Sequence, residues 1–148
     1  MKRFLFRMES VLSYRKALET ARQEELAQAR HLMQQEMDRL SALKNHKEQL
    51  FHSARQQRLQ GVHACQEELV ELYLQNIEIR MLEQEDRISQ AQVVVDRCLQ
   101  AVIEAMKERK MLEQLKERHR EAYLAEAARE DMATLDEMAS LRAKRASA

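Results

Sequence analysis

The sequence contains no proline and no tryptophan, and it has a single glycine among its 148 residues. Proline and glycine mark the turns, hairpin loops and strand ends of β-rich and α/β proteins, and glycine also builds the loops that bind phosphate groups. A chain with one such residue is not expected to form a β-sandwich, a doubly wound α/β domain or a glycine-rich nucleotide-binding loop.

An excess of charge of one sign is also lacking, because 25 basic side chains are balanced by 25 acidic ones. The chain therefore has no overall basic field to attract nucleic acid, and we expect no nucleic-acid partner. No apolar run approaches the roughly 20 residues that span a bilayer. The apolar run from Phe4 to Phe6 is too short for a signal peptide, so we expect a cytoplasmic protein.

Leucine, alanine, methionine and charged residues make up most of the chain, which is typical of long helices and coiled coils rather than of a disordered protein. The apolar spacing of the first half fits a seven-residue coiled-coil repeat from Leu26 onward, and a slip of register is predicted between Leu18 and Leu26. The predicted a and d positions of this repeat are Leu26, Ala29, Met33, Glu36, Leu40, Leu43, Lys47, Leu50, Ala54 and Gln57.

The second half carries a further helical stripe, interrupted by a polar patch around residues 83–90. Cysteine residues at 65 and 98 are predicted to serve as small apolar members of it, and their separation of about 50 Å on one helix excludes a disulfide. The predicted stripe consists of Val62, Cys65, Leu69, Leu72, Asn76 and Ile79, and then of Val95, Cys98, Val102, Ala105 and Leu112.

Gly61 lies between the two halves and indicates a turn, because glycine is favoured just after a helix and costs about 1 kcal/mol inside one. Chain reversal here would place residues with numbers summing to about 122 opposite each other. Segment 44–58, with four basic residues and one acidic one, would then face segment 64–78, with four acidic residues. These charges favour an antiparallel hairpin over the alternative, one continuous helix that dimerises.

The predicted architecture is all-α, a single coiled-coil hairpin over 1–148, with a first helix at about 4–58, a turn at about 59–62 and a longer second helix at about 63–142. The first helix reaches only to about residue 118 of the second. The remaining residues would project as an amphipathic helix that either binds another protein or frays. Its predicted apolar face consists of Leu124, Ala128, Met132, Leu135, Met138 and Leu141.

Catalytic chemistry is not indicated anywhere in the sequence. His63 and Cys65 stand alone without a second pair at zinc spacing, and the carboxylates of a thin helical hairpin have no pocket that would raise their pKa. Phosphate-loop, zinc-protease and serine-hydrolase motifs are missing. We therefore expect no enzyme activity, no metal, no cofactor and no small-molecule substrate.

Both ends of the chain carry spaced motifs that resemble those of the FliJ family. The start resembles the motif F-x-F-R-x-E-x-V-L-x-x-R and runs from Phe4 to Arg15. Residues 105–116 resemble A-x-x-E-R-K-x-L-E-x-L-K, and residues 135–142 resemble L-D-E-x-A-x-x-R. Residues 27–104 match only in length and helical character.

FliJ-type proteins are coiled-coil components of the bacterial flagellar type III export apparatus. The resemblance implies a non-enzymatic stalk that inserts its terminal end into a hexameric flagellar export ATPase and promotes its assembly. It also implies contacts with export chaperones and with the cytoplasmic domain of an export-gate membrane protein, and peripheral association with the inner membrane at the flagellar base. The residues that the resemblance implies for binding the ATPase ring are Phe4, Phe6, Arg7, Glu9, Leu12, Tyr14, Arg15, Leu112, Glu113, Leu115, Lys116, Tyr123, Leu135, Asp136, Glu137 and Arg142.

A second, gate-facing region is predicted near the turn, formed by Leu69, Leu72, Asn76 and Ile79 with Leu43 and Leu50 opposite. Two alternative functions remain open at this stage. One is the equivalent stalk of a virulence injectisome, which has nearly the same physical requirements. The other is a structural coiled-coil homodimer that acts as a scaffold without an ATPase.

Overall fold

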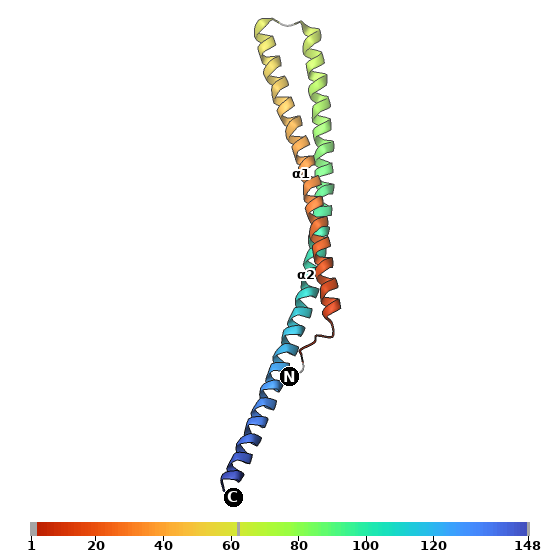
Figure 1. The fold of residues 1–148 in the computed structure, drawn as a ribbon. Helices are drawn as coiled ribbons and strands as arrows, with labels where there is room; N and C mark the ends of the chain where they lie inside the picture. Colours follow the sequence, from red (N-terminus) through yellow and green to blue (C-terminus); the bar gives the residue numbers. More distant parts are fainter. Residues whose placement is uncertain (1–2, 62, 148) are drawn as a thin grey trace. The chain divides into compact units, whose positions relative to one another are not determined.

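The computed structural model describes residues 3–61 and 63–147, and these residues form two long α-helices without any strand (Figure 1). Helix α1 spans Glu9–Gln60 and helix α2 spans Ala64–Ala146. The helices pack side by side and run antiparallel, which confirms the predicted all-α hairpin with a longer second helix.

The chain reverses at Gly61, which has a φ of +82°. This left-handed conformation is easy for glycine and strained for residues with a Cβ atom, which explains why the only glycine lies here. The Gly61 amide donates a hydrogen bond to the Arg58 carbonyl (3.4 Å) and so closes the last turn of α1. The predicted turn near Gly61 is confirmed, although Val62 lies outside the described residues.

Helix α1 begins at Glu9, five residues later than the predicted start near residue 4. Residues 3–6 are extended rather than helical, and the amide of Glu9 donates a hydrogen bond to the carbonyl of Phe6 (3.2 Å). The physical reason is tertiary, because an extended segment allows both phenylalanine side chains to reach α2, as described below.

Two compact units divide the chain, and each contains a part of both helices. The larger unit covers the described part of Ala21–Ile103, including the turn, and the other combines the described residues up to Thr20 with those from Glu104 onward. The apolar core of the larger unit is formed by Leu26, Ala29, Val95 and Val102, against which Met33, Cys98 and Leu99 pack. Cys98 is thus a packing residue, as predicted, whereas Cys65 is exposed.

Oppositely charged residues pair across the two helices near the turn. Lys47 lies 2.8 Å from Glu78, and Arg58 lies 3.2 Å from Glu67. The residue numbers of each pair sum to 125, close to the predicted value of about 122. The charge pattern of segments 44–58 and 64–78 therefore identified the pairing of the helices correctly.

The predicted slip of register before Leu26 is wrong. Low exposure recurs without a break, at alternating spacings of three and four residues, along the side of α1 that faces α2 (the α1 seam). Hydrophobicity alone misses this continuity because charged residues occupy several of the positions. Contacts with polar groups of α2 are made by Arg15, Glu19, Glu36 and Lys47. Arg22 pairs with Glu25 of its own helix. The α1 seam continues upstream of Leu26 through Arg22, Glu19, Arg15 and Leu12.

The predicted stripe of α2 is also wrong between residues 65 and 90. Ile77 is buried there with 2% exposure, whereas Leu69 and Ile79 are 67% and 58% exposed. Gln84 can occupy a buried seam position because its side-chain amide donates hydrogen bonds to the carbonyl (2.9 Å) and the carboxylate of Glu36. The α2 seam in this region consists of Val70, Leu74, Ile77, Met81, Gln84, Ile88 and Ala91.

Candidate protein-binding surfaces

The extended N-terminal segment packs on α2 through its aromatic side chains. Phe6 is 8% exposed, and its ring centroid lies 5.8 Å from that of His119 in an edge-on arrangement. The Phe4 ring lies 5.6 Å from that of Tyr123. Leu12, in the first turns of α1, is the most completely buried large side chain, with 1% exposure. Apolar and aromatic burial therefore hold the start of the chain against α2.

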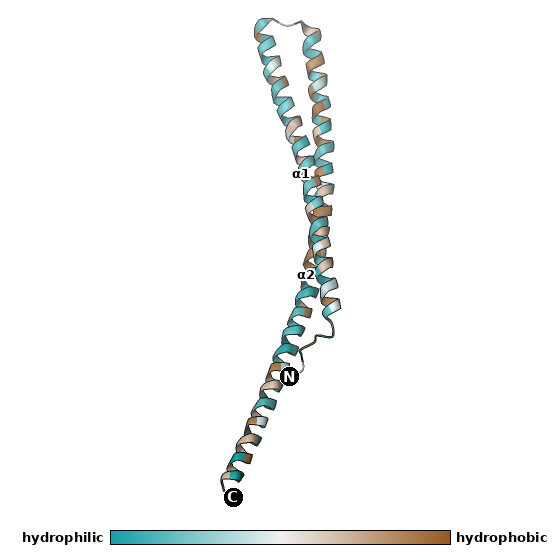
Figure 2. Ribbon diagram, viewed as in Figure 1, coloured by the Kyte–Doolittle hydropathy of each residue, from teal (hydrophilic) through white to brown (hydrophobic). Residues whose placement is uncertain are grey.

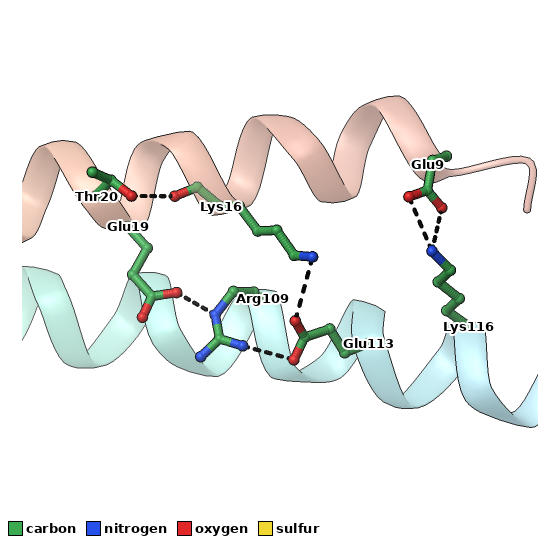
Figure 3. Close-up of polar contacts among 7 residues, drawn as sticks. All are labelled: Glu9, Lys16, Glu19, Thr20, Arg109, Glu113 and Lys116. Atoms are coloured by element: carbon green, nitrogen blue, oxygen red, sulfur yellow. Dashed lines mark hydrogen bonds and ion pairs between the residues drawn. The ribbon is translucent and has the colours of Figure 1, made fainter.

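Ion pairs join the same parts of the two helices (Figure 3). Lys116 lies 2.7 Å from Glu9, and Lys16 lies 3.8 Å from Glu113. Arg15 also pairs with Glu108. The residue numbers of these pairs sum to between 123 and 129, close to the value of about 122 predicted for the hairpin.

Arg109 stands at the centre of this ion-pair network and contacts Glu19 on α1 and Glu113 on its own helix (Figure 3). The hydrogen bond from its guanidinium to Glu19, and then that to Glu113, raise the pKa of Arg109 above its ordinary value. Glu19 is only 8% exposed. Sequence reasoning missed Glu19 as a structural residue, since a carboxylate on an apolar seam is uncommon.

Removing one partner of the Glu19–Arg109 pair should lower the free energy of unfolding more than removing both partners. We expect Glu19→Leu to lower the urea midpoint of unfolding clearly, because it leaves the Arg109 guanidinium without its main acceptor. The double variant with Arg109→Leu should recover more than half of that loss through apolar packing. Circular dichroism during urea titration measures both changes, and a double variant that is less stable than Glu19→Leu would contradict the expectation.

The residues implied to bind an ATPase ring fall into two groups in the structure. Several contribute to the contacts between α2 and the start of the chain and are buried or half-buried: Phe4, Phe6, Leu12, Arg15, Leu112, Glu113, Leu115, Lys116 and Tyr123. Glu9 is exposed but is paired with Lys116. The others are exposed and make no ion pair among the described residues: Arg7, Tyr14, Leu135, Asp136, Glu137 and Arg142.

Beyond Tyr123, α2 continues to Ala146 as a single helix that α1 does not cover. All described residues after Tyr123 are exposed except Ala127, which is half-buried. Figure 2 shows apolar positions recurring along this part of α2 among polar ones. The projecting amphipathic helix expected from the sequence is therefore present, and its large apolar side chains are uncovered: Leu124, Met132, Leu135, Met138 and Leu141.

The residues predicted to face a gate protein do not form one continuous surface. Leu69, Leu72 and Ile79 are exposed on α2, and Asn76 is exposed between them. Leu43 and Leu50 are half-buried on the α1 seam, where they help to pack the hairpin. Of the predicted gate-facing residues, only those on α2 are therefore exposed.

Within residues 3–61 and 63–147, no cluster of three or more histidine, cysteine or acidic side chains is arranged to bind a metal ion. Over the same residues, neither helix has a stretch long and apolar enough to cross a bilayer.

Comparison with known proteins assigns nearly the whole sequence to one family. The family model of the flagellar FliJ protein matches residues 4–148. Among solved structures, the YscO homolog CT670 from Chlamydia trachomatis is similar, with a TM-score of 0.54 and 22% identity over 94% of each chain, which shows a shared fold. A search of curated proteins gives no significant match. Because the family model covers nearly every residue, this chain belongs to the FliJ family of type III export components.

Proposed function

We propose that this protein is the non-enzymatic stalk of the bacterial flagellar type III export apparatus. In this proposal it inserts its terminal end into the hexameric export ATPase, promotes assembly of the ring, and contacts the export gate and export chaperones. It acts in the cytoplasm, peripherally associated with the inner membrane at the flagellar base, and requires no cofactor or small-molecule substrate. Membership of the FliJ family supports the export role.

The observation that carries the ATPase contact is the uncovered apolar face of α2 beyond Tyr123. This part of α2 exposes five large apolar side chains to water over residues 124–141. Burying them in a protein cavity is favourable because apolar surface is removed from water. The centre of a hexameric ring is a cavity of this kind, and a single helix is narrow enough to enter it. Titration of the purified export ATPase with this protein tests the proposal.

The exposed motif residues are the best candidates for direct contacts with the ring. Leu135 supplies apolar area, while Asp136, Glu137 and Arg142 supply charges that could orient the helix in the ring. Arg7 and Tyr14 add exposed groups near the start of the chain. The buried members of the motifs act differently in this proposal, because they hold the hairpin together at the end that enters the ring.

The gate contact near the turn yields a separate prediction. Replacing Leu72 and Ile79 with alanine should weaken binding to the cytoplasmic domain of the gate protein about tenfold or more and reduce swimming motility, since both side chains are exposed and available for burial. The matched control replaces Val93 and Met111, which are similarly exposed on α2. Normal motility and normal gate binding of the Leu72/Ile79 variant would contradict a gate contact at this patch.

The injectisome stalk is the second candidate, favoured by the fold shared with a YscO homolog. The two functions differ in what is lost when the gene is deleted. A flagellar stalk is required for assembly of external flagellar parts, whereas an injectisome stalk is required for secretion of virulence proteins. The third reading, a homodimeric scaffold that depends on dimerisation to fold, is disfavoured because each helix already packs against the other helix of its own chain.

A further inference from the structure

A groove lies between α1 and α2 at the end of the hairpin nearest Gly61. Figure 1 shows the two helices separating toward this turn, and the space between their side chains has a volume of about 850 Å³. Half-buried Ala54, Val70 and Leu74 line it together with Phe51, whose side chain is 52% exposed. The groove therefore has an apolar floor that the hairpin itself does not fill.

The two rims of the groove carry opposite charges. Arg55 and Arg58 lie on the α1 rim, and Glu67 and Glu71 lie on the α2 rim. Glu48 adds one acidic group to the α1 rim, at the end farther from the turn. The basic character of α1 and the acidic character of α2 are therefore concentrated in the half of the groove that adjoins Gly61.

In the half of the groove nearest the turn, one charge on each rim has no partner in the described part of the chain. Arg58 pairs with Glu67 across the groove, whereas Arg55 and Glu71 are exposed and make no ion pair or side-chain hydrogen bond among residues 3–61 and 63–147. Their residue numbers sum to 126, so they lie at nearly the same level as the neighbouring pair. The separation of the helices keeps them apart and leaves one cation and one anion facing the same apolar space.

We propose that this groove binds an amphipathic helix of a partner protein. The apolar face of that helix lies on Phe51, Val70 and Leu74, with an acidic side chain toward Arg55 and a basic one toward Glu71. A convex helix fills a concave groove, as in other helix-in-groove complexes. The same groove on a second copy is also concave, and two facing grooves would leave voids that close-packed interfaces avoid.

This interaction is separate from the contacts proposed above. Leu69, Leu72 and Ile79 do not line the groove, and neither does any residue beyond Leu74. A helix bound there would not occupy the patch assigned to the gate or the uncovered face of residues 124–141. The proposal therefore stands or falls independently of the ATPase and gate contacts.

Three synthetic peptides of about 20 residues, long enough to form helix in water, provide the probe. All share one leucine-rich face, and the positions flanking it are glutamate on one side and lysine on the other, glutamate on both sides, or lysine on both sides. Fluorescence anisotropy measures their binding to the full chain. We expect the mixed peptide to bind at least about fivefold more tightly than either single-charge peptide, since each like-charge contact is unfavourable.

Charge reversal on one rim should change the preferred peptide. Arg55→Glu makes both rims acidic and should favour the all-lysine peptide. Glu71→Lys puts a lysine beside Glu67, which removes the net negative charge of the α2 rim, and should favour the all-glutamate peptide. Arg80→Glu and Glu68→Lys are matched controls, because they reverse exposed charges that do not line the groove. The controls should retain the preference of the unmodified chain for the mixed peptide.

Three results would overturn the proposal. The first is an unchanged order of the three peptides in the Arg55 and Glu71 variants. The second is a lack of binding by every peptide up to about 1 mM, which corresponds to an interaction of only about 4 kcal/mol. The third is a concentration-dependent dimer in sedimentation that Arg55→Glu abolishes, because the groove would then be occupied by a second copy of this chain.

Discussion

Removal of residues 124–148 is expected to abolish binding of this protein to the export ATPase. The truncation deletes the whole uncovered apolar face of α2 but keeps His119 and Tyr123, which pack against Phe6 and Phe4. It removes 23 of the 135 residues that α1 (52 residues) and α2 (83 residues) contain, so most helicity should remain. Titration of the ATPase and far-ultraviolet circular dichroism measure the two outcomes.

The position of the cut matters because the predicted end of the first helix, opposite about residue 118, would place a deletion at residue 119. That deletion would also remove His119 and Tyr123 and expose the rings of Phe6 and Phe4. A loss of binding could then result from a disturbed N-terminal segment rather than from the missing helix. Cutting after Tyr123 separates these two effects.

A substitution that keeps the helix provides the matched control for the truncation. Replacing Leu135 and Met138 with alanine retains a strong helix former at both positions and removes only apolar side-chain area. If both side chains are buried in the ring, affinity should fall at least about 100-fold, since each contributes about 1.5–3 kcal/mol. Unchanged affinity in the truncated protein would rule out insertion of this helix into the ring.

Leu12→Ala is expected to cause a large loss of stability, about 3 kcal/mol. Leu12 is 1% exposed, and its truncation both loses apolar contact and leaves a cavity where the start of α1 packs on α2. The matched control is Leu32→Ala, which removes the same atoms from a side chain that is 59% exposed in the same helix. The control should change stability by less than about 0.5 kcal/mol.

Urea unfolding followed by circular dichroism measures both alanine variants. Equal losses for Leu12→Ala and Leu32→Ala would contradict the assignment of Leu12 as the principal apolar contact of the N-terminal part. Because Leu12 also belongs to the motif shared with the FliJ family, the result bears on function. A destabilised Leu12 variant that still binds the ATPase would show that this motif residue acts through folding alone.

The hairpin itself could be predicted because its signals are local. The single glycine of the sequence marked the turn between the two helices, and opposite charges on segments 44–58 and 64–78 indicated which faces pair. The apolar repeat from Leu26 to Ala54 matched the α1 seam residue by residue. These signals depend on backbone preference, on charge and on hydrophobic spacing, and none of them requires detailed knowledge of the partner helix.

The α2 seam between residues 65 and 90 could not be predicted in the same way. Two stripes of similar hydrophobicity run along this part of α2, one through Leu69, Leu72 and Ile79 and one through Val70, Leu74 and Ile77. Only the second faces α1, where Gln84 gains hydrogen bonds to Glu36. Hydrophobicity therefore did not distinguish the two, and the hydrogen-bonding partner on α1 was needed.

The candidate sites show the same division. The uncovered apolar face beyond Tyr123 followed from the unequal lengths of the two predicted helices. The separation of the motif residues into buried and exposed groups could not be predicted from the sequence. An F-x-F-R motif has the same sequence whether its aromatic rings contact α2 or a partner protein. The Glu19–Arg109 pair and the groove beside Gly61 were also missed, since each depends on how far apart the two helices lie.

The sequence by itself determined that this chain is two helices joined at Gly61 and that the second helix is too long for the first to cover. Helix preference, the single glycine and the charge pattern indicate this because each is a property of residues that are close together in the sequence. Only the tertiary structure decided which stripe of α2 is buried, which motif residues remain exposed and where a charged groove opens. Those features depend on contacts between residues far apart in the chain, whose energies a one-dimensional pattern does not contain.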